Sequence, residues 1–127
     1  MPDTRLIRTF LEPHHAALAE RAGSFARGAI ARRADPADDA AARVEARALV
    51  QLLGGGGWLK PIFDLDLRGC CLVREALAWA SPLADAVFAL QGLGTTPILS
   101  GGSTAQKERW LGPIAEGRVM TAFAMTE

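Results

Sequence analysis

Apolar residues recur every three or four positions through most of the chain, which is the spacing that lines one face of an α-helix. This pattern predicts five helices, over residues 13–34, 39–53, 67–78, 82–100 and 104–111. A residue able to cap or start a helix stands before or at the beginning of each one: Pro13, Asp38, Asp66, Ser81 with Pro82, and Ser103. Gln106 follows Ser103 at the spacing of a capping box. Most of the chain is therefore predicted to be helical.

Proline and glycine mark where these helices should end. Pro36 disfavours helical geometry in the residue before it, and the run Gly54–Gly57 should stop the second helix before a loop. Pro97 should kink or interrupt the fourth helix, and Gly101–Gly102 should end it. The last helix should end before Gly112–Pro113. These residues set the predicted boundaries between elements.

The hydrophobic period changes to two from Val119 onward. Residues 119, 121, 123 and 125 fall on one side of an extended chain, which predicts a β-strand over residues 119–127. No other segment alternates in this way, and one strand cannot satisfy its own backbone groups. The predicted fold is therefore all-α, an antiparallel bundle of about five helices over residues 1–118, with a single C-terminal β-strand that begins a β-domain missing from these residues.

Composition and charge narrow the function classes. The 127 residues carry 14 basic and 14 acidic side chains, so the overall charge favours neither nucleic acid nor an anionic membrane surface as a partner. No apolar run reaches the roughly 20 residues that a membrane span needs, and residues 1–10 lack a signal-peptide core. We expect a cytoplasmic protein in which the adjacent Cys70 and Cys71 are reduced thiols.

The segment from Gly94 to Gly117 is the most specific part of the sequence. It holds a glycine, a Pro-Ile pair, a second glycine, a Gln-Lys pair, an aromatic-Leu pair and a Glu-Gly pair: Gly94, Pro97-Ile98, Gly101, Gln106-Lys107, Trp110-Leu111 and Glu116-Gly117. In these residues the chain resembles the acyl-CoA dehydrogenase family, and residues 121–127 resemble that family's flavin-facing strand. The resemblance implies an N-terminal helical domain that ends at the first strand of a flavin-binding β-domain.

The resemblance also implies an activity. Such enzymes remove two hydrogens, α and β to the thioester of an acyl-CoA, with a carboxylate taking the α-proton and FAD taking the β-hydride. The carboxylate base is expected outside this chain, in the remaining β and C-terminal helical domains or in a companion subunit. The 127-residue chain is therefore expected to be inactive alone. An oligomeric assembly is expected, with an electron-transfer flavoprotein as one candidate acceptor.

Two sets of site residues follow from the resemblance, position by position. The flavin ring is expected beside Phe123, Met125 and Thr126, where a strand edge and a hydroxyl can reach the cofactor. The acyl chain is expected against the fourth helix, at Ala86, Ala89, Leu90 and Leu93. Small residues there would leave width for a branched or cyclic acyl group. The alternative for each set is plain packing against neighbouring elements.

Two other functional hypotheses remain open. The chain can be a non-catalytic helical interaction subunit that keeps the fold and pairs with a full-length relative. Alternatively, the catalytic domains belong to the same gene and are not included in this sequence. Either alternative leaves the predicted helical fold unchanged.

Other candidate sites are weak. His14 and His15 are the only histidines, and adjacent residues should point to different faces of a helix, so we expect no shared metal. The run Gly54–Gly57 is not followed by the Lys and Ser or Thr of a phosphate loop, so we interpret it as a helix stop.

Overall fold

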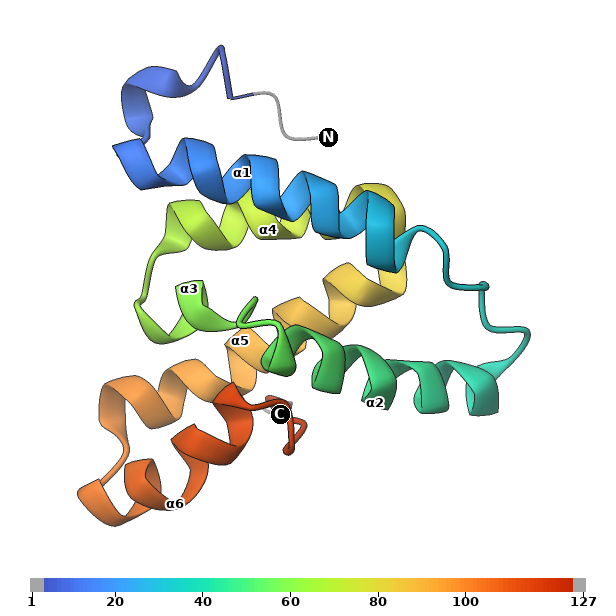
Figure 1. Cartoon of the computed structure of the whole chain (residues 1–127). Coiled ribbons are helices and arrows are strands. Elements are labelled where there is room, and N and C mark those ends of the chain that lie inside the picture. The colour runs from blue at the N-terminus through green and yellow to red at the C-terminus, as the bar shows by residue number, and fades with distance from the viewer. Residues whose placement is uncertain (1–3, 125–127) are drawn as a thin grey trace.

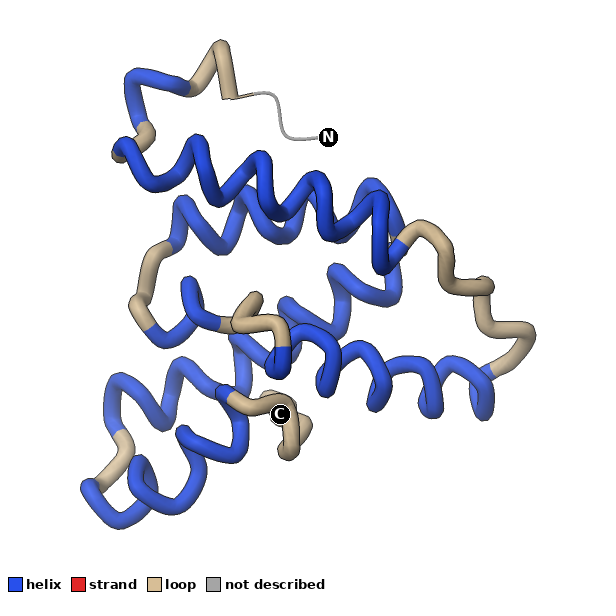
Figure 2. The backbone as a smooth tube through the Cα atoms, viewed as in Figure 1, coloured by secondary structure: helices blue, strands red, loops and turns tan. Residues whose placement is uncertain are grey.

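The computed structural model describes residues 4–124, in which helices, turns and loops are found and no strand (Figure 2). The predicted all-α fold is thereby confirmed. A short 3-10 helix, η1 (Arg8–Phe10), precedes the first α-helix, and a π-helical turn (Ala26–Ile30) extends that helix. The α-helices are α1 (Pro13–Phe25), α2 (Asp39–Gly55), α3 (Lys60–Phe63), α4 (Leu67–Ala80), α5 (Pro82–Gly101) and α6 (Thr104–Ala115).

The helices pack around one core. In Figure 1, α1 and α4 lie side by side and run in the same direction, while α5 returns beneath them antiparallel to α4. Helix α2 packs against α5 from the other side, and α6 folds back on the second half of α5. The largest members of the core are Leu18, Ile30, Leu49, Leu53, Leu59, Ile62, Leu77 and Phe88. Its burial, at about 25 cal/mol per Å² of apolar surface, holds the layers together.

The predicted helix starts are confirmed. Pro13 is the first residue of α1, and the carboxylate of Asp38 accepts a hydrogen bond from the Ala41 amide at 2.8 Å. Asp66 caps α4 and Ser81 caps α5 in the same way. Ser103 forms the predicted capping box of α6 with Gln106. Each cap satisfies a backbone amide that a helix leaves free at its start.

Several predicted boundaries were wrong. The first helix ends at Ile30 rather than at residue 34, because a π-type bond from the Ala31 amide to the Ala26 carbonyl closes its last turn. A short helix, α3, forms where a loop was expected. Helix α5 continues through Pro97 without interruption, and α6 continues through Pro113 to Ala115. A proline removes one backbone hydrogen bond from a helix, but neither Pro97 nor Pro113 ends the helix that contains it.

The predicted strand is absent over residues 119–124, the part of it that the structure describes. A strand needs a partner ladder, and here the side chain of Gln91 bonds the backbone of this segment instead. Met125 lies outside the described residues. The segment is held to a helix rather than to a sheet.

One close backbone contact joins the end of α2 to the turn after α6. A Cβ atom added at Gly54 would overlap the backbone of Glu116 and Gly117, so only glycine fits there. Gly117 also has a positive φ of 71°, a conformation that glycine adopts at little cost. These glycines bring together two elements 63 positions apart in the sequence.

None of the described helices has the length and apolar character needed to cross a membrane.

Candidate functional site

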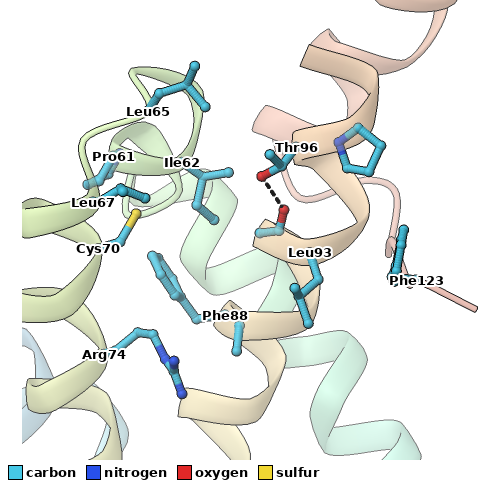
Figure 3. A pocket seen from close by; sticks show the side chains of 13 residues that line it. Pro61, Ile62, Leu65, Leu67, Cys70, Arg74, Phe88, Leu93, Thr96 and Phe123 are labelled. Atoms are coloured by element: carbon cyan, nitrogen blue, oxygen red, sulfur yellow. Dashed lines mark hydrogen bonds between the residues drawn. The ribbon is translucent and has the colours of Figure 1, made fainter. Parts of the chain in front are cut away.

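An apolar cavity of about 480 Å³ lies between α3, α4 and α5 (Figure 3). This volume falls within the range of small-molecule sites in proteins. Apolar side chains dominate its lining, which consists of Pro61, Ile62, Leu65, Leu67, Cys70, Arg74, Phe88, Ala89, Gly92, Leu93, Thr96, Pro97 and Phe123. The cavity suits the apolar part of a ligand.

One face of α5 forms the longest wall of the cavity. Ala89, Gly92, Leu93 and Thr96 follow one another at spacings of three, one and three, so they share a side of the helix. The Thr96 hydroxyl donates to the Gly92 carbonyl at 2.8 Å, which satisfies it within the helix (Figure 3). A Cβ atom at Gly92 would contact only Ile62, at an ordinary 3.7 Å. Gly92 therefore leaves open space in the cavity rather than avoiding a clash.

The polar groups at the edge of the cavity are already engaged. The guanidinium of Arg74 donates two hydrogen bonds to the carboxylate of Asp85, at 2.7 and 2.8 Å, and this pairing raises the pKa of Arg74. Burial, together with the nearby charge of Asp66, raises the pKa of the Cys70 thiol to about 11. Cys70 is therefore a neutral thiol at physiological pH, and its thiolate is not available as a nucleophile.

A segment from the C-terminal end of the chain completes the lining. The Thr121 amide donates to the Gln91 side-chain oxygen at 2.5 Å, and the Gln91 side-chain nitrogen donates to the Val119 carbonyl at 3.1 Å. Two residues further along, Phe123 reaches the cavity with about half of its surface exposed. Figure 3 shows it on the far side of Leu93 from Phe88.

The structure places some of the predicted site residues in the cavity lining and others outside it. Ala89 and Leu93, predicted for the acyl chain, and Phe123, predicted for the flavin, all line the cavity. Ala86 and Leu90 are exposed and do not line the cavity, although each lies three positions before a lining residue of α5, Ala89 or Leu93. Met125 and Thr126 lie outside the described residues.

Sequence reasoning missed other lining residues. Gly92 and Thr96 follow Ala89 and Leu93 by three positions, so helical spacing alone could have found them. Cys70 and Arg74 come from α4, and no pattern in the sequence indicates which helix faces α5 across the cavity.

A second cluster contradicts the expectation that the two histidines point apart. Their rings lie 4.1 Å apart, and both approach Asp66, with His15 Nε2 at 3.0 Å and His14 Nε2 at 3.4 Å from the carboxylate. His15 is placed so because its Nδ1 accepts a hydrogen bond from the Glu12 amide at 2.8 Å. The rings and Asp66 have the geometry of a metal-ligand group. However, a neutral His15 that accepts at Nδ1 carries its proton on Nε2 and has no lone pair there for a metal.

The comparison with known families agrees with the resemblance seen in the sequence. The acyl-CoA dehydrogenase N-terminal domain matches residues 12–118. This chain belongs to the acyl-CoA dehydrogenase family. The matched region of this family member contains all of α1 to α6, and with them every lining residue of the cavity except Phe123.

Members of the acyl-CoA dehydrogenase family are generally flavoproteins, and the described residues fit only part of a flavin. Phe123 offers an aromatic face at the cavity that can lie against a ring system. The Thr121 amide and hydroxyl are bonded to Gln91, and no buried side-chain polar atom in the described part of the chain lacks a partner. These residues suit an apolar contact with the ring and offer no cradle for the phosphates.

Proposed function

We propose that this chain supplies one wall of the acyl pocket and the first flavin contacts of an FAD-dependent acyl-CoA dehydrogenase. The observation that carries the proposal is the apolar cavity, which joins Ala89 and Leu93 of α5 to Phe123 in one lining. The acyl chain of an acyl-CoA thioester would lie along α5, and Phe123 would face the flavin. Met125 and Thr126 would extend the flavin contacts.

The reaction needs a base that takes the α-proton of the thioester. The lining of the described cavity contains no aspartate, glutamate or histidine, so the base belongs to another part of the enzyme. When bound, FAD supplies the acceptor for the β-hydride. The residues of this chain bind the apolar tail, hold it against α5 and exclude water from it, and they do not move a proton.

Binding of the acyl chain would draw on apolar burial, at about 0.8 kcal/mol for each methylene group removed from water. Ala89 has a small side chain and Gly92 has none, so the cavity is wide where it borders this turn of α5. This width fits a branched or cyclic acyl group as well as a linear one. Arg74 is the only charged residue of the described lining, and it is paired with Asp85. The lining therefore offers no free charge for an acyl group that carries a carboxylate of its own.

The test is a flavin absorbance spectrum of the purified chain, recorded with and without a companion subunit that carries the flavin-binding β-domain. We expect bound flavin with the companion only, and a shift of its spectrum on addition of an acyl-CoA. Ala89→Trp should abolish the shift because it fills the cavity. Ala17→Trp, the same substitution at an exposed position of α1, which contributes no residue to the lining, should leave the shift intact. Absence of flavin under both conditions would refute the proposal.

The second candidate is a non-catalytic subunit that pairs with a full-length relative. Exposed apolar side chains near the cavity favour a partner: Leu90 and Leu93 on α5 are 47% and 55% exposed, and Met120 is 50% exposed. The same surface would face the remaining domains in a complete enzyme. A stable complex that contains flavin only in the relative, with unchanged activity, would favour this candidate. The first proposal also includes an oligomeric assembly and an electron-transfer flavoprotein as the electron acceptor.

A further inference from the structure

Gln91 is a polar residue in the interior of the helical domain. Its side chain is 1% exposed, in the middle of α5, and it reaches the C-terminal segment rather than its own helix. One end of its amide accepts from the Thr121 amide at 2.5 Å, and the other end donates to the Val119 carbonyl at 3.1 Å. Leaving such backbone groups buried without partners would cost about 1 to 3 kcal/mol each.

The surface of α5 around Gln91 is shaped for the same segment. A Cβ atom at Gly94 would lie 2.6 Å from the Thr121 Cβ and 2.8 Å from the Ala122 amide nitrogen, so the segment touches the helix backbone at that point. The Thr121 hydroxyl adds a bond of 3.1 Å to the Gln91 carbonyl. The contact combines a glycine that allows close approach with hydrogen bonds that allow only one register.

Only a group that both donates and accepts can bond these two backbone groups at once. Leucine would fill the space without bonding either of them, and glutamate would match them only when protonated. The register of residues 119–121 on α5 therefore depends on an amide at position 91. Phe123 lies two residues beyond Thr121, so the same register determines where its ring meets the cavity.

We propose that Gln91 is a positioning residue, which fixes residues 119–123 on α5 and thereby places Phe123 at the mouth of the cavity. The role in catalysis rests on the proposed function, while the placement itself concerns this chain alone. A ligand that fills the cavity contacts Phe123, so ligand binding and the Gln91 bonds support each other. The coupling acts in both directions, as any coupling of two binding equilibria must.

The test is amide hydrogen exchange of the full chain, as wild type and as Gln91→Leu and Gln91→Glu. Gln91→Leu should lower the protection of the Thr121 amide by about tenfold, because it removes the acceptor of that amide's hydrogen bond, worth roughly 1.4 kcal/mol. Amides of α1 and α4 should keep their protection. Gln91→Glu should behave like wild type at acidic pH, where its carboxyl can donate to Val119, and like Gln91→Leu above its titration. Gln51→Leu, on an exposed position of α2, is the matched control.

A pH-dependent rescue by glutamate is a signature that simple loss of packing does not produce. Equal protection of the Thr121 amide in wild type and Gln91→Leu would overturn the proposal. So would a loss spread evenly over α1, α4 and α5, which would make Gln91 a core residue only.

A second measurement uses octanoyl-N-acetylcysteamine as the acyl thioester. It should raise the protection of the Thr121 amide in wild type and much less in Gln91→Leu. Failure of the thioester to protect the wild type would refute the proposed acyl pocket, whereas the ligand-free comparison would still decide the role of Gln91.

Discussion

Replacement of Asp66 by alanine should destabilise the protein by more than the loss of an ordinary helix cap. Asp66 accepts a hydrogen bond from the Gly69 amide at 3.0 Å as the cap of α4. It also accepts from Nε2 of His15, whose side chain is 1% exposed. Asp66→Ala therefore removes a cap and deprives a buried donor of its acceptor.

The two losses have different magnitudes. Loss of the cap costs about 1 kcal/mol, and an unsatisfied buried N–H costs about 1 to 3 kcal/mol. The Asp66 side chain is 21% exposed, so water can enter after truncation and reduce the second cost. We expect a total loss of about 2 to 3 kcal/mol in the free energy of unfolding. Asp38→Ala removes only the cap of α2 and should cost about 1 kcal/mol.

The assay is urea unfolding followed by far-UV circular dichroism, with Asp38→Ala as the matched control. A difference of at least about 1 kcal/mol between the two variants is the expected contribution of the bond to His15. If Asp66→Ala costs no more than Asp38→Ala, the reasoning about His15 is refuted. The slope m of the unfolding free energy against urea concentration should be the same in both variants. An unchanged slope would exclude a change in the unfolded state as the cause of the difference.

The pH dependence has a defined sign. Burial opposes ionisation of Asp66, but bonds from Gly69, His15 and His14 outweigh it, and the pKa of the carboxyl is lowered in the folded protein. A lowered pKa contributes stability above the unfolded-state pKa of about 3.9, and that stability is lost as pH falls through the folded pKa. The difference in stability between wild type and Asp66→Ala should therefore shrink on acidification below about pH 5. A difference that grows in acid would contradict this assignment.

Two further predictions concern neighbouring pairs. Gly54→Ala should cost about 1 to 3 kcal/mol of stability, because its Cβ would overlap the Glu116 and Gly117 backbone. Gly55→Ala has open space around it and should be neutral or stabilising by up to about 1 kcal/mol. Thermal unfolding of the two variants checks the sign of each change. Cys71 is exposed while the Cys70 pKa is raised to about 11, so iodoacetamide at pH 8 should label Cys71 first, and peptide mass spectrometry that finds Cys70 labelled first would contradict this.

Local signals in the sequence were enough to predict how the helices start. Ser103 with Gln106, and Ser81 with Pro82, act within four residues of the backbone groups they satisfy, so no knowledge of the tertiary fold is needed. Predicted helix ends were less accurate, because Pro97 and Pro113 were expected to mark ends and both helices continue through them.

The candidate site could be predicted only on the helix that carries most of it. The spacing of Ala89 and Leu93 indicates one face of α5, but the opposite wall comes from α3 and α4, which the sequence does not place. The expectation that His14 and His15 point to different faces was wrong for a similar reason. Side-chain direction at His15 is determined by its bond to the Glu12 amide, and Asp66, which lies 51 positions away, draws both rings to one point.

The Gln91 contact has a consequence for how this chain meets other chains. An extended apolar segment with free amides and carbonyls is a template for intermolecular β-pairing, and so for aggregation. Because Val119 and Thr121 are already bonded to Gln91, an incoming strand finds neither their carbonyl nor their amide available. A single buried side-chain amide thus occupies two of the backbone groups through which a sheet could grow.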